Sequence, residues 1–174
     1  MKRIAVLRHA KSSSAEAGMD DFDRPLNDRG RADAMLVGRA LAQRSIRFDR
    51  VIASPAQRVR QTLERLGAGY GEPLDVTFDP PLYGAGSADW LEVIRALPES
   101  VAAPLLAGHN PSLHELVLGL TDRDEAGLRD QVRGQYPTGA LALIELPAER
   151  WAEIRPGCGK IVDLILPRSL AADA

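Results

Sequence analysis

The chain lacks several features that would define its class directly. Cys158 is the only cysteine, so no intramolecular disulfide can form and nothing indicates an oxidising compartment. No apolar run approaches the ~18 residues that a membrane-spanning helix needs, and the stretch before His9 is too short for a signal peptide. The formal net charge of −2 gives no electrostatic reason to expect a nucleic acid or a membrane surface as a partner. We therefore expect a cytoplasmic protein.

Common nucleotide and metal motifs are also missing. Gly159-Lys160 resembles the end of a phosphate-binding P-loop, but the first glycine and the final Ser or Thr of that motif are replaced by isoleucines. The three histidines show neither a His-x-His nor a His-Glu-x-x-His spacing, and His114 is expected on the solvated surface of a helix. The acidic residues 20–23 lack the glycine and the closing glutamate of an EF-hand and predict a solvated loop. Neither a metal nor a cofactor is expected.

The 174 residues show short apolar runs that alternate with segments of helical periodicity. The runs are typical of buried strands and fall at residues 4–7, 51–53, 75–78, 104–107, 140–146 and 161–166. This alternation predicts an α/β fold made of a single domain over residues 1–174, with a central, mostly parallel sheet and helices on both faces. The connection between the last two runs is short and contains proline and glycine, so that pair is expected to be antiparallel.

Polar clusters follow three of these predicted strands. They read Arg-His-Ala-Lys at 8–11, Ser-Pro-Ala-Gln-Arg at 54–58 and Gly-His-Asn-Pro at 108–111. Because the carboxyl ends of parallel strands face the ligand crevice, we expect the three clusters to meet there. Ser54 and Asn110, each followed by proline, also predict helix starts whose backbone N–H groups point to the same place.

The side chains in these clusters suit phosphoryl chemistry. Arg8 and Arg58 offer planar N–H donors that match phosphoryl oxygens. His9 or His109 supplies an imidazole, which can attack phosphorus as a covalent nucleophile. Phosphoryl transfer depends mainly on positioning and on neutralising the equatorial oxygens, and this set of residues provides for both.

Together, the three clusters resemble the histidine phosphatase (phosphoglycerate mutase-like) superfamily, and most closely its small SixA-type phosphohistidine phosphatases. The resemblance includes Gln61-Thr62 after the second cluster, the pattern Phe-Asp-Arg-Pro-Leu-Asn-x-Arg-Gly at 22–30 and Pro167-Arg168 near the end. It covers nearly the whole chain in order and spacing. Ala10 departs from the glycine common at that place in the wider superfamily, but fits the small branch.

The resemblance implies a role for each matching residue. His9 would be the nucleophile and pass through a phosphohistidine intermediate, with Arg8, Arg58 and His109 holding the phosphoryl oxygens. It implies a phosphatase without a cofactor, whose partner is a phosphorylated protein or a small phosphorylated substrate. The candidate substrate-binding residues beside this catalytic set are Lys11, Arg24, Ser54 and Asn110.

A general acid is not evident in the sequence. Larger members of the superfamily usually carry a Glu or Asp that protonates an alcohol leaving group, and here only Asp79, Asp89 and Glu92 lie near the corresponding stretch. Phosphohistidine differs from an ester, because its ring can take a proton near the ~6.5 pKa of imidazole and leave neutral. The missing acid therefore favours a phosphoamide substrate.

Three functions stay open at this point. The leading hypothesis is a metal-independent phosphatase that acts on phosphohistidine in a protein. The second is a phosphomonoesterase or mutase for a small metabolite, which would need Asp79, Asp89 or Glu92 as proton donor. The third is a non-catalytic module that binds phosphoproteins, and the presence of a nucleophile at His9 argues against it. The sequence predicts neither the partner protein nor the oligomeric state.

Overall fold

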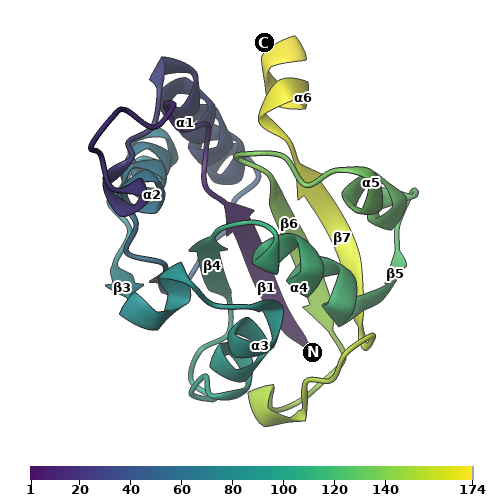
Figure 1. Ribbon diagram of the computed structural model, residues 1–174. Helices are drawn as coiled ribbons and strands as arrows, with labels where there is room; N and C mark the ends of the chain where they lie inside the picture. The colour runs from purple at the N-terminus through teal and green to yellow at the C-terminus, as the bar shows by residue number, and fades with distance from the viewer. Residues whose placement is uncertain (174) are drawn as a thin grey trace.

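The computed structural model describes residues 1–173, which form seven strands in one sheet (Figure 1). The strands lie in the order β3-β2-β4-β1-β6-β7-β5. Their bounds are β1 Lys2–Arg8, β2 Arg50–Ala53, β3 Val76–Phe78, β4 Pro104–Gly108, β5 Thr121–Asp124, β6 Leu141–Leu146 and β7 Gly159–Ile165. The predicted α/β fold with a central, mostly parallel sheet is confirmed.

The sheet is parallel except around β6. Strands β3, β2, β4 and β1 pair in parallel, as do β7 and β5. Strand β6 runs antiparallel to both of its neighbours, β1 and β7. The expected antiparallel pairing of the last two apolar runs is thus confirmed. As a result, β1, β2 and β4 end at the same edge of the sheet.

Helices cover both faces, as predicted. One face carries α1, α2 and α6, and the other carries α3, α4 and α5 (Figure 1). The helix bounds are α1 Asp28–Gln43, α2 Gln57–Tyr70, α3 Ser87–Arg95, α4 Ser112–Leu120, α5 Leu128–Gly134 and α6 Pro167–Ala172. Three short 3-10 helices complete the described elements, namely η1 Asp21–Asp23, η2 Pro80–Tyr83 and η3 Trp151–Glu153. Among residues 1–173, no helix combines the length and apolarity needed to cross a membrane.

The two apolar cores follow from the alternation of side chains along the strands. In β1, Ile4 and Val6 join one core, whereas Ala5 and Leu7 join the other. All four are at most 2% exposed. Because β1 is buried on both faces, its sequence is a continuous apolar run, and polar residues begin only where the strand ends.

Two predicted helix starts, with Ser54 and Asn110 as caps and the following prolines as first helical residues, were wrong by two residues and one residue. Helix α2 begins at Gln57 and not at Pro55, and α4 begins at Ser112 and not at Pro111. The Ser54 hydroxyl still accepts from the Ala56 N–H at 3.3 Å, but it caps a turn that precedes the helix. Helix α1, in contrast, has a side-chain cap, since the Asn27 side chain accepts from the N–H of Gly30 at 2.8 Å.

The start of α1 lies directly against the loop that follows β1. The N–H of Asn27 donates to the Lys11 carbonyl at 3.0 Å. A Cβ at position 30 would collide with that same carbonyl oxygen, so only glycine allows this approach. The packing of α1 therefore fixes the backbone just beyond His9.

His114 was wrongly expected on a solvated helix surface. It is half-buried, and its Nε2 lies 2.6 Å from the carbonyl oxygen of Val132 in α5. Its ring also stacks on Tyr136, with 6.1 Å between the ring centroids. His114 thus has a structural role between α4 and α5.

Candidate active site

The three polar clusters meet where β1, β2 and β4 end. Arg8 pairs in register with Gly108, and Ala53 pairs with Ala107, so the residues that follow these strands are neighbours. A cavity of about 440 Å³ lies at this edge. Its lining includes seven of the eight predicted site residues, namely Arg8, His9, Lys11, Arg24, Arg58, His109 and Asn110.

His9 is held with one ring nitrogen free. Its side chain is nearly buried, and Nδ1–H donates to the carbonyl oxygen of Ala10 at 2.7 Å. Because a carbonyl can only accept, this contact places the proton on Nδ1 and leaves the lone pair on Nε2. Burial lowers the pKa of His9 to about 3, and the positive charges of His109, Arg58 and Arg8 also lower it. The ring is therefore neutral and nucleophilic at physiological pH.

His109 is oriented by Ser54, the eighth predicted residue. The Ser54 hydroxyl lies 2.7 Å from His109 Nε2 and is fully buried, so it acts behind the imidazole and does not line the cavity. The prediction that Ser54 binds substrate is thus corrected to a positioning role. Burial, followed by the charge of Arg58, lowers the pKa of His109 to about 4. A neutral His109 whose Nε2 accepts from Ser54 carries its proton on Nδ1.

Unpaired donors concentrate around this one cavity. Across residues 1–173, six buried side-chain polar atoms have no hydrogen-bond partner within the protein, and five of them belong to residues that line it. These five atoms are Nε of Arg8, Arg24 and Arg58, Nδ1 of His109 and Oδ1 of Asn110. Buried donors without partners are costly. Four of the five are donors, which suits a multiply charged oxyanion.

Tyr136 positions two of the lining residues through its backbone. Its carbonyl oxygen accepts from Arg8 at 3.1 Å and from the Asn110 amide at 2.8 Å. The Tyr136 hydroxyl donates to the Val6 carbonyl at 2.6 Å and accepts from the Ala142 N–H at 3.1 Å. This anchoring inside the sheet holds the carbonyl in place. No sequence pattern indicates this role, because the contact is made by a main-chain atom.

Thr62 links the backbone around His9 to helix α2. Its hydroxyl accepts from the Ala10 N–H at 2.9 Å and donates to the Arg58 carbonyl at 2.6 Å. The neighbouring Gln61 accepts from the Leu26 N–H at 2.8 Å. The Gln-Thr pair therefore fixes the nucleophile, an arginine and the loop before α1 relative to one another.

Asp21 is a site residue that the sequence analysis missed. Its Oδ2 accepts from Arg58 at 3.1 Å and from the Tyr83 hydroxyl at 2.7 Å, and its Oδ1 lies 3.1 Å from an Arg24 nitrogen. The hydrogen bond from Tyr83, followed by the charges of Arg58 and Arg24, lowers the pKa of Asp21. The acidic segment expected to be merely solvated thus places one carboxylate on the arginines. In the sequence, the indication of this ion pair was Arg24, three residues after Asp21.

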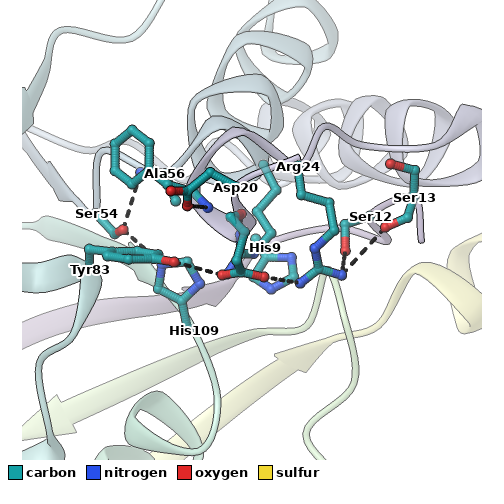
Figure 2. Close-up of polar contacts among 12 residues, drawn as sticks. His9, Ser12, Ser13, Asp20, Arg24, Ser54, Ala56, Tyr83 and His109 are labelled. Carbon is teal, nitrogen blue, oxygen red and sulfur yellow. Dashed lines mark hydrogen bonds and ion pairs between the residues drawn. The ribbon is translucent and has the colours of Figure 1, made fainter. Parts of the chain in front are cut away.

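Tyr83 was also missed. The Asp21 carboxylate raises the pKa of the Tyr83 phenol, which therefore stays protonated and donates. Its ring packs edge-on against His109, with 5.7 Å between centroids, and edge-on against Phe22 at 5.1 Å. Figure 2 shows Tyr83 lying across His109 with its hydroxyl directed toward the polar network around His9.

Arg24 and Lys11 also line the cavity. Arg24 donates to the Ser12 hydroxyl at 2.9 Å and to the Ser13 carbonyl at 3.4 Å (Figure 2). Lys11 is exposed. Their positions agree with the predicted contact to substrate, which remains a prediction.

The three acids considered as proton donors lie elsewhere. Asp89 accepts from the Gly86 N–H at the start of α3, and Glu92 pairs with Arg95 at 2.8 Å. Asp79 precedes η2 and, like the other two, is absent from the cavity lining. Among residues 1–173, no group of three or more His, Cys, Asp or Glu side chains is placed to hold a metal ion.

Comparison with known proteins agrees with this geometry. The family model of the histidine phosphatase superfamily (branch 1) matches residues 4–136, a span that contains all eight predicted site residues. The chain belongs to this superfamily. The resemblance of the three clusters is thereby confirmed.

Several relatives of this histidine phosphatase match most of its length. Phosphohistidine phosphatase SixA of Escherichia coli K12 is 29% identical over 146 residues, which cover 83% of this chain and 85% of that protein. An uncharacterised protein of Mycobacterium tuberculosis H37Rv is 34% identical over 168 residues, which cover 93% of this chain and all of the relative. The crystal structure of a candidate phosphohistidine phosphatase SixA from Agrobacterium tumefaciens matches with a TM-score of 0.81 and 30% identity, covering 95% of this chain and 98% of the other.

Proposed function

We propose that this chain removes the phosphoryl group from phosphohistidine in a protein, through a phosphohistidine intermediate on His9. The observation that carries the proposal is the state of the His9 ring. Nδ1–H is committed to the Ala10 carbonyl, and the free Nε2 belongs to a residue lining a cavity with three arginines. A module that only binds phosphate requires the arginines but does not require a neutral, oriented nucleophile.

The reaction divides into two displacements at phosphorus. In the first, the Nε2 lone pair of His9 forms a bond to phosphorus, and the bond to the substrate ring nitrogen breaks with its electron pair returning to that ring. In the second, a water oxygen attacks phosphorus and the bonding pair returns to Nε2, releasing dihydrogen phosphate, which gives one proton to solvent to become hydrogen phosphate. Arg8, Arg58 and Arg24 supply the donors that neutralise the phosphoryl oxygens in both steps.

The leaving group favours phosphoamides over unactivated esters. An alkoxide must be protonated as it leaves, and general acid catalysis is commonly worth ~10²–10⁴-fold. Asp79, Asp89 and Glu92 lie outside the cavity lining, and the carboxylate that contacts the site, Asp21, is held in its ionised form. A protonated phosphohistidine ring needs no donor, because it leaves as neutral imidazole.

The rim of the cavity suits a substrate carried on a protein. The cavity is lined by the connection from β1 to α1, by the first turn of α2 and by the short connections after β4 and α5, which contain no inserted subdomain. Such a rim allows a phosphohistidine side chain to enter while its own protein remains outside. The similarity to SixA-type phosphohistidine phosphatases supports the same substrate class.

The test compares substrates and traps the intermediate. We expect kcat/KM for a phosphohistidine-bearing protein to exceed that for sugar phosphates and phosphoserine peptides by at least a hundredfold. A rapid quench without acid should find ³²P on His9, and His9→Ala should show neither label nor turnover. Label on Cys158 or a serine would contradict the mechanism. A metabolite ester as best substrate, with Asp79, Asp89 or Glu92 essential, would instead establish the phosphomonoesterase or mutase alternative.

A further inference from the structure

We propose that Asp21 determines the specificity of this site for phosphohistidine, by accepting the N–H of the substrate's imidazole ring while His9 attacks phosphorus. This inference rests on the proposed function. It assigns a role to the one carboxylate that, among the described residues, is bonded to both Arg58 and Arg24. In that role Asp21 contacts the leaving group and not the phosphoryl oxygens.

The direction of attack places the leaving group near Asp21. The nucleophile and the leaving atom lie on opposite sides of phosphorus in an in-line displacement. His9 is 7% exposed and forms the inner wall of the cavity, so the leaving ring must point outward. The Asp21 side chain is 53% exposed and is tied to Arg58, which also lines the cavity. Asp21 is not part of the lining itself, but its exposed carboxylate is paired with two lining residues, Arg24 and Arg58, on the side where the substrate ring would emerge.

The contacts of Asp21 leave it able to accept one more hydrogen bond. A carboxylate has about four lone-pair positions on its two oxygens. Tyr83 and Arg58 occupy two positions on Oδ2, whereas Oδ1 has only the ion pair with Arg24. Because half of the side chain is exposed, an incoming N–H can reach the remaining positions without breaking the existing contacts.

The negative charge of Asp21 discriminates between the two substrate classes. A phosphohistidine ring that carries a proton on its second nitrogen is cationic, and a nearby carboxylate stabilises that form. When the bond to phosphorus breaks, the electron pair returns to the first nitrogen and neutral imidazole leaves with its N–H intact, so no proton has to be transferred. An ester offers no such N–H, and its leaving oxygen gains negative charge beside the carboxylate.

The charged and titratable groups around Asp21 leave it ionised across the working range. Arg24 faces it from its own loop, Arg58 from α2, Tyr83 from η2 and His109 from the end of β4. The pKa of Asp21 is lowered, whereas those of His9 and His109 lie at about 3 and about 4. Between pH 6 and 9, a change in activity that occurs only with phosphohistidine therefore reports the protonation of the substrate's imidazole ring.

The experiment measures kcat and kcat/KM from pH 6 to 9 for a phosphohistidine peptide and for p-nitrophenyl phosphate, an activated ester. We expect Asp21→Asn to lower the phosphohistidine kcat/KM value tenfold or more at pH 8, since a hydrogen bond to a charged group is worth roughly that factor. The alkaline limb of the phosphohistidine kcat profile, which reports the ring while it is bound beside Asp21, should also move down by about one pH unit. The ester value should change less than threefold or rise. Asp23→Asn, which removes an exposed charge from the same segment, should leave both profiles unchanged.

The other outcomes separate this proposal from the one it rests on. Equal losses on both substrates in Asp21→Asn, with an unmoved alkaline limb, would overturn the proposal and show that Asp21 merely holds the arginines. A wild-type enzyme that prefers the ester would contradict the proposed function before any variant is made, and the Asp21 proposal would fail with it.

Discussion

The Ser54 hydroxyl, 2.7 Å from Nε2 of His109, determines which nitrogen of that imidazole carries the proton. Nε2 accepts from the hydroxyl, because among the described residues it is the acceptor within hydrogen-bond distance of Ser54 Oγ, whereas the other contact of that oxygen, the Ala56 N–H, is a donor. Nδ1 then bears the proton, and it is a buried atom without a partner within the described residues. A buried serine thus converts a neutral histidine into a donor toward the cavity, without the desolvation cost of an imidazolium.

Ser54→Ala is expected to reduce kcat/KM about tenfold, which corresponds to the loss of one hydrogen bond. Without the hydroxyl, His109 can carry its proton on Nε2, and Nδ1 then no longer donates toward the cavity. The measurement is a steady-state assay together with ¹⁵N NMR of His109, where the wild type should show the Nδ1–H tautomer and the variant a mixture. Ser13→Ala is the matched control, because Ser13 also lines the cavity but bonds the Pro25 carbonyl. A variant with unchanged activity and an unchanged tautomer would refute this role of Ser54.

Arg58→Ala should lose far more activity than Arg60→Ala. The two side chains leave α2 roughly 200° apart. Arg58 lines the cavity, whereas Arg60 donates to the Pro55 carbonyl at 2.8 Å and lies over the Phe78 ring at 4.0 Å. Loss of one charged donor to a transition-state oxyanion costs about 3 kcal/mol, or about a hundredfold in kcat/KM. Arg60→Ala should leave kcat/KM within threefold, and comparable losses in the two variants would contradict the assignment.

Activity should not depend on a metal ion. Three guanidinium groups line the cavity and provide the positive charge that a divalent cation supplies in other phosphoryl-transfer sites. The test is kcat/KM before and after exhaustive chelation with EDTA, which we expect to agree within twofold. A large loss that added magnesium or manganese restores would show that the acidic residues of the loop before α1 have a different role.

The site core could be predicted because its position depends on strand burial. Each of β1, β2 and β4 is an apolar run in the sequence, and the first polar residues after each run must lie at the same edge of a parallel sheet. This reasoning needs no knowledge of the loops. It brought together Arg8, His9, Arg58 and His109, which all line one cavity.

The missed elements depend on contacts that leave no local pattern. Asp21 and Arg58 are 37 positions apart, and the segment between them, which contains α1 and β2, has no local pattern that would indicate their contact. Strand β5 consists of Thr-Asp-Arg-Asp and is a strand only because β7 pairs with it. Helix α2 begins three residues after Ser54 because the serine hydroxyl caps a preceding turn and contacts His109.

The last prediction concerns stability in acid. The native state keeps His9 neutral down to about pH 3, whereas an unfolded chain binds that proton near its ordinary pKa of 6.5. Between these values the unfolded state holds more protons, so the free energy of unfolding falls as the pH falls from 6.5 toward 3 and is fully retained above 6.5. At pH 5 the difference of 1.5 units corresponds to about 2 kcal/mol for His9 alone. The prediction applies to the pH dependence and not to the stability at neutral pH.

Urea denaturation at pH 7.5 and pH 5.0 measures this effect. We expect the wild type to lose at least about 2 kcal/mol between the two conditions and His9→Ala to lose about 2 kcal/mol less than the wild type does. His109→Ala should reduce the loss in the same direction, because burial also lowers the pKa of His109, to about 4. Both variants remove a buried base that the native state cannot protonate. If His9→Ala were as sensitive to acid as the wild type, then His9 would be protonated in the native state at pH 5, and it could not serve as a neutral nucleophile there.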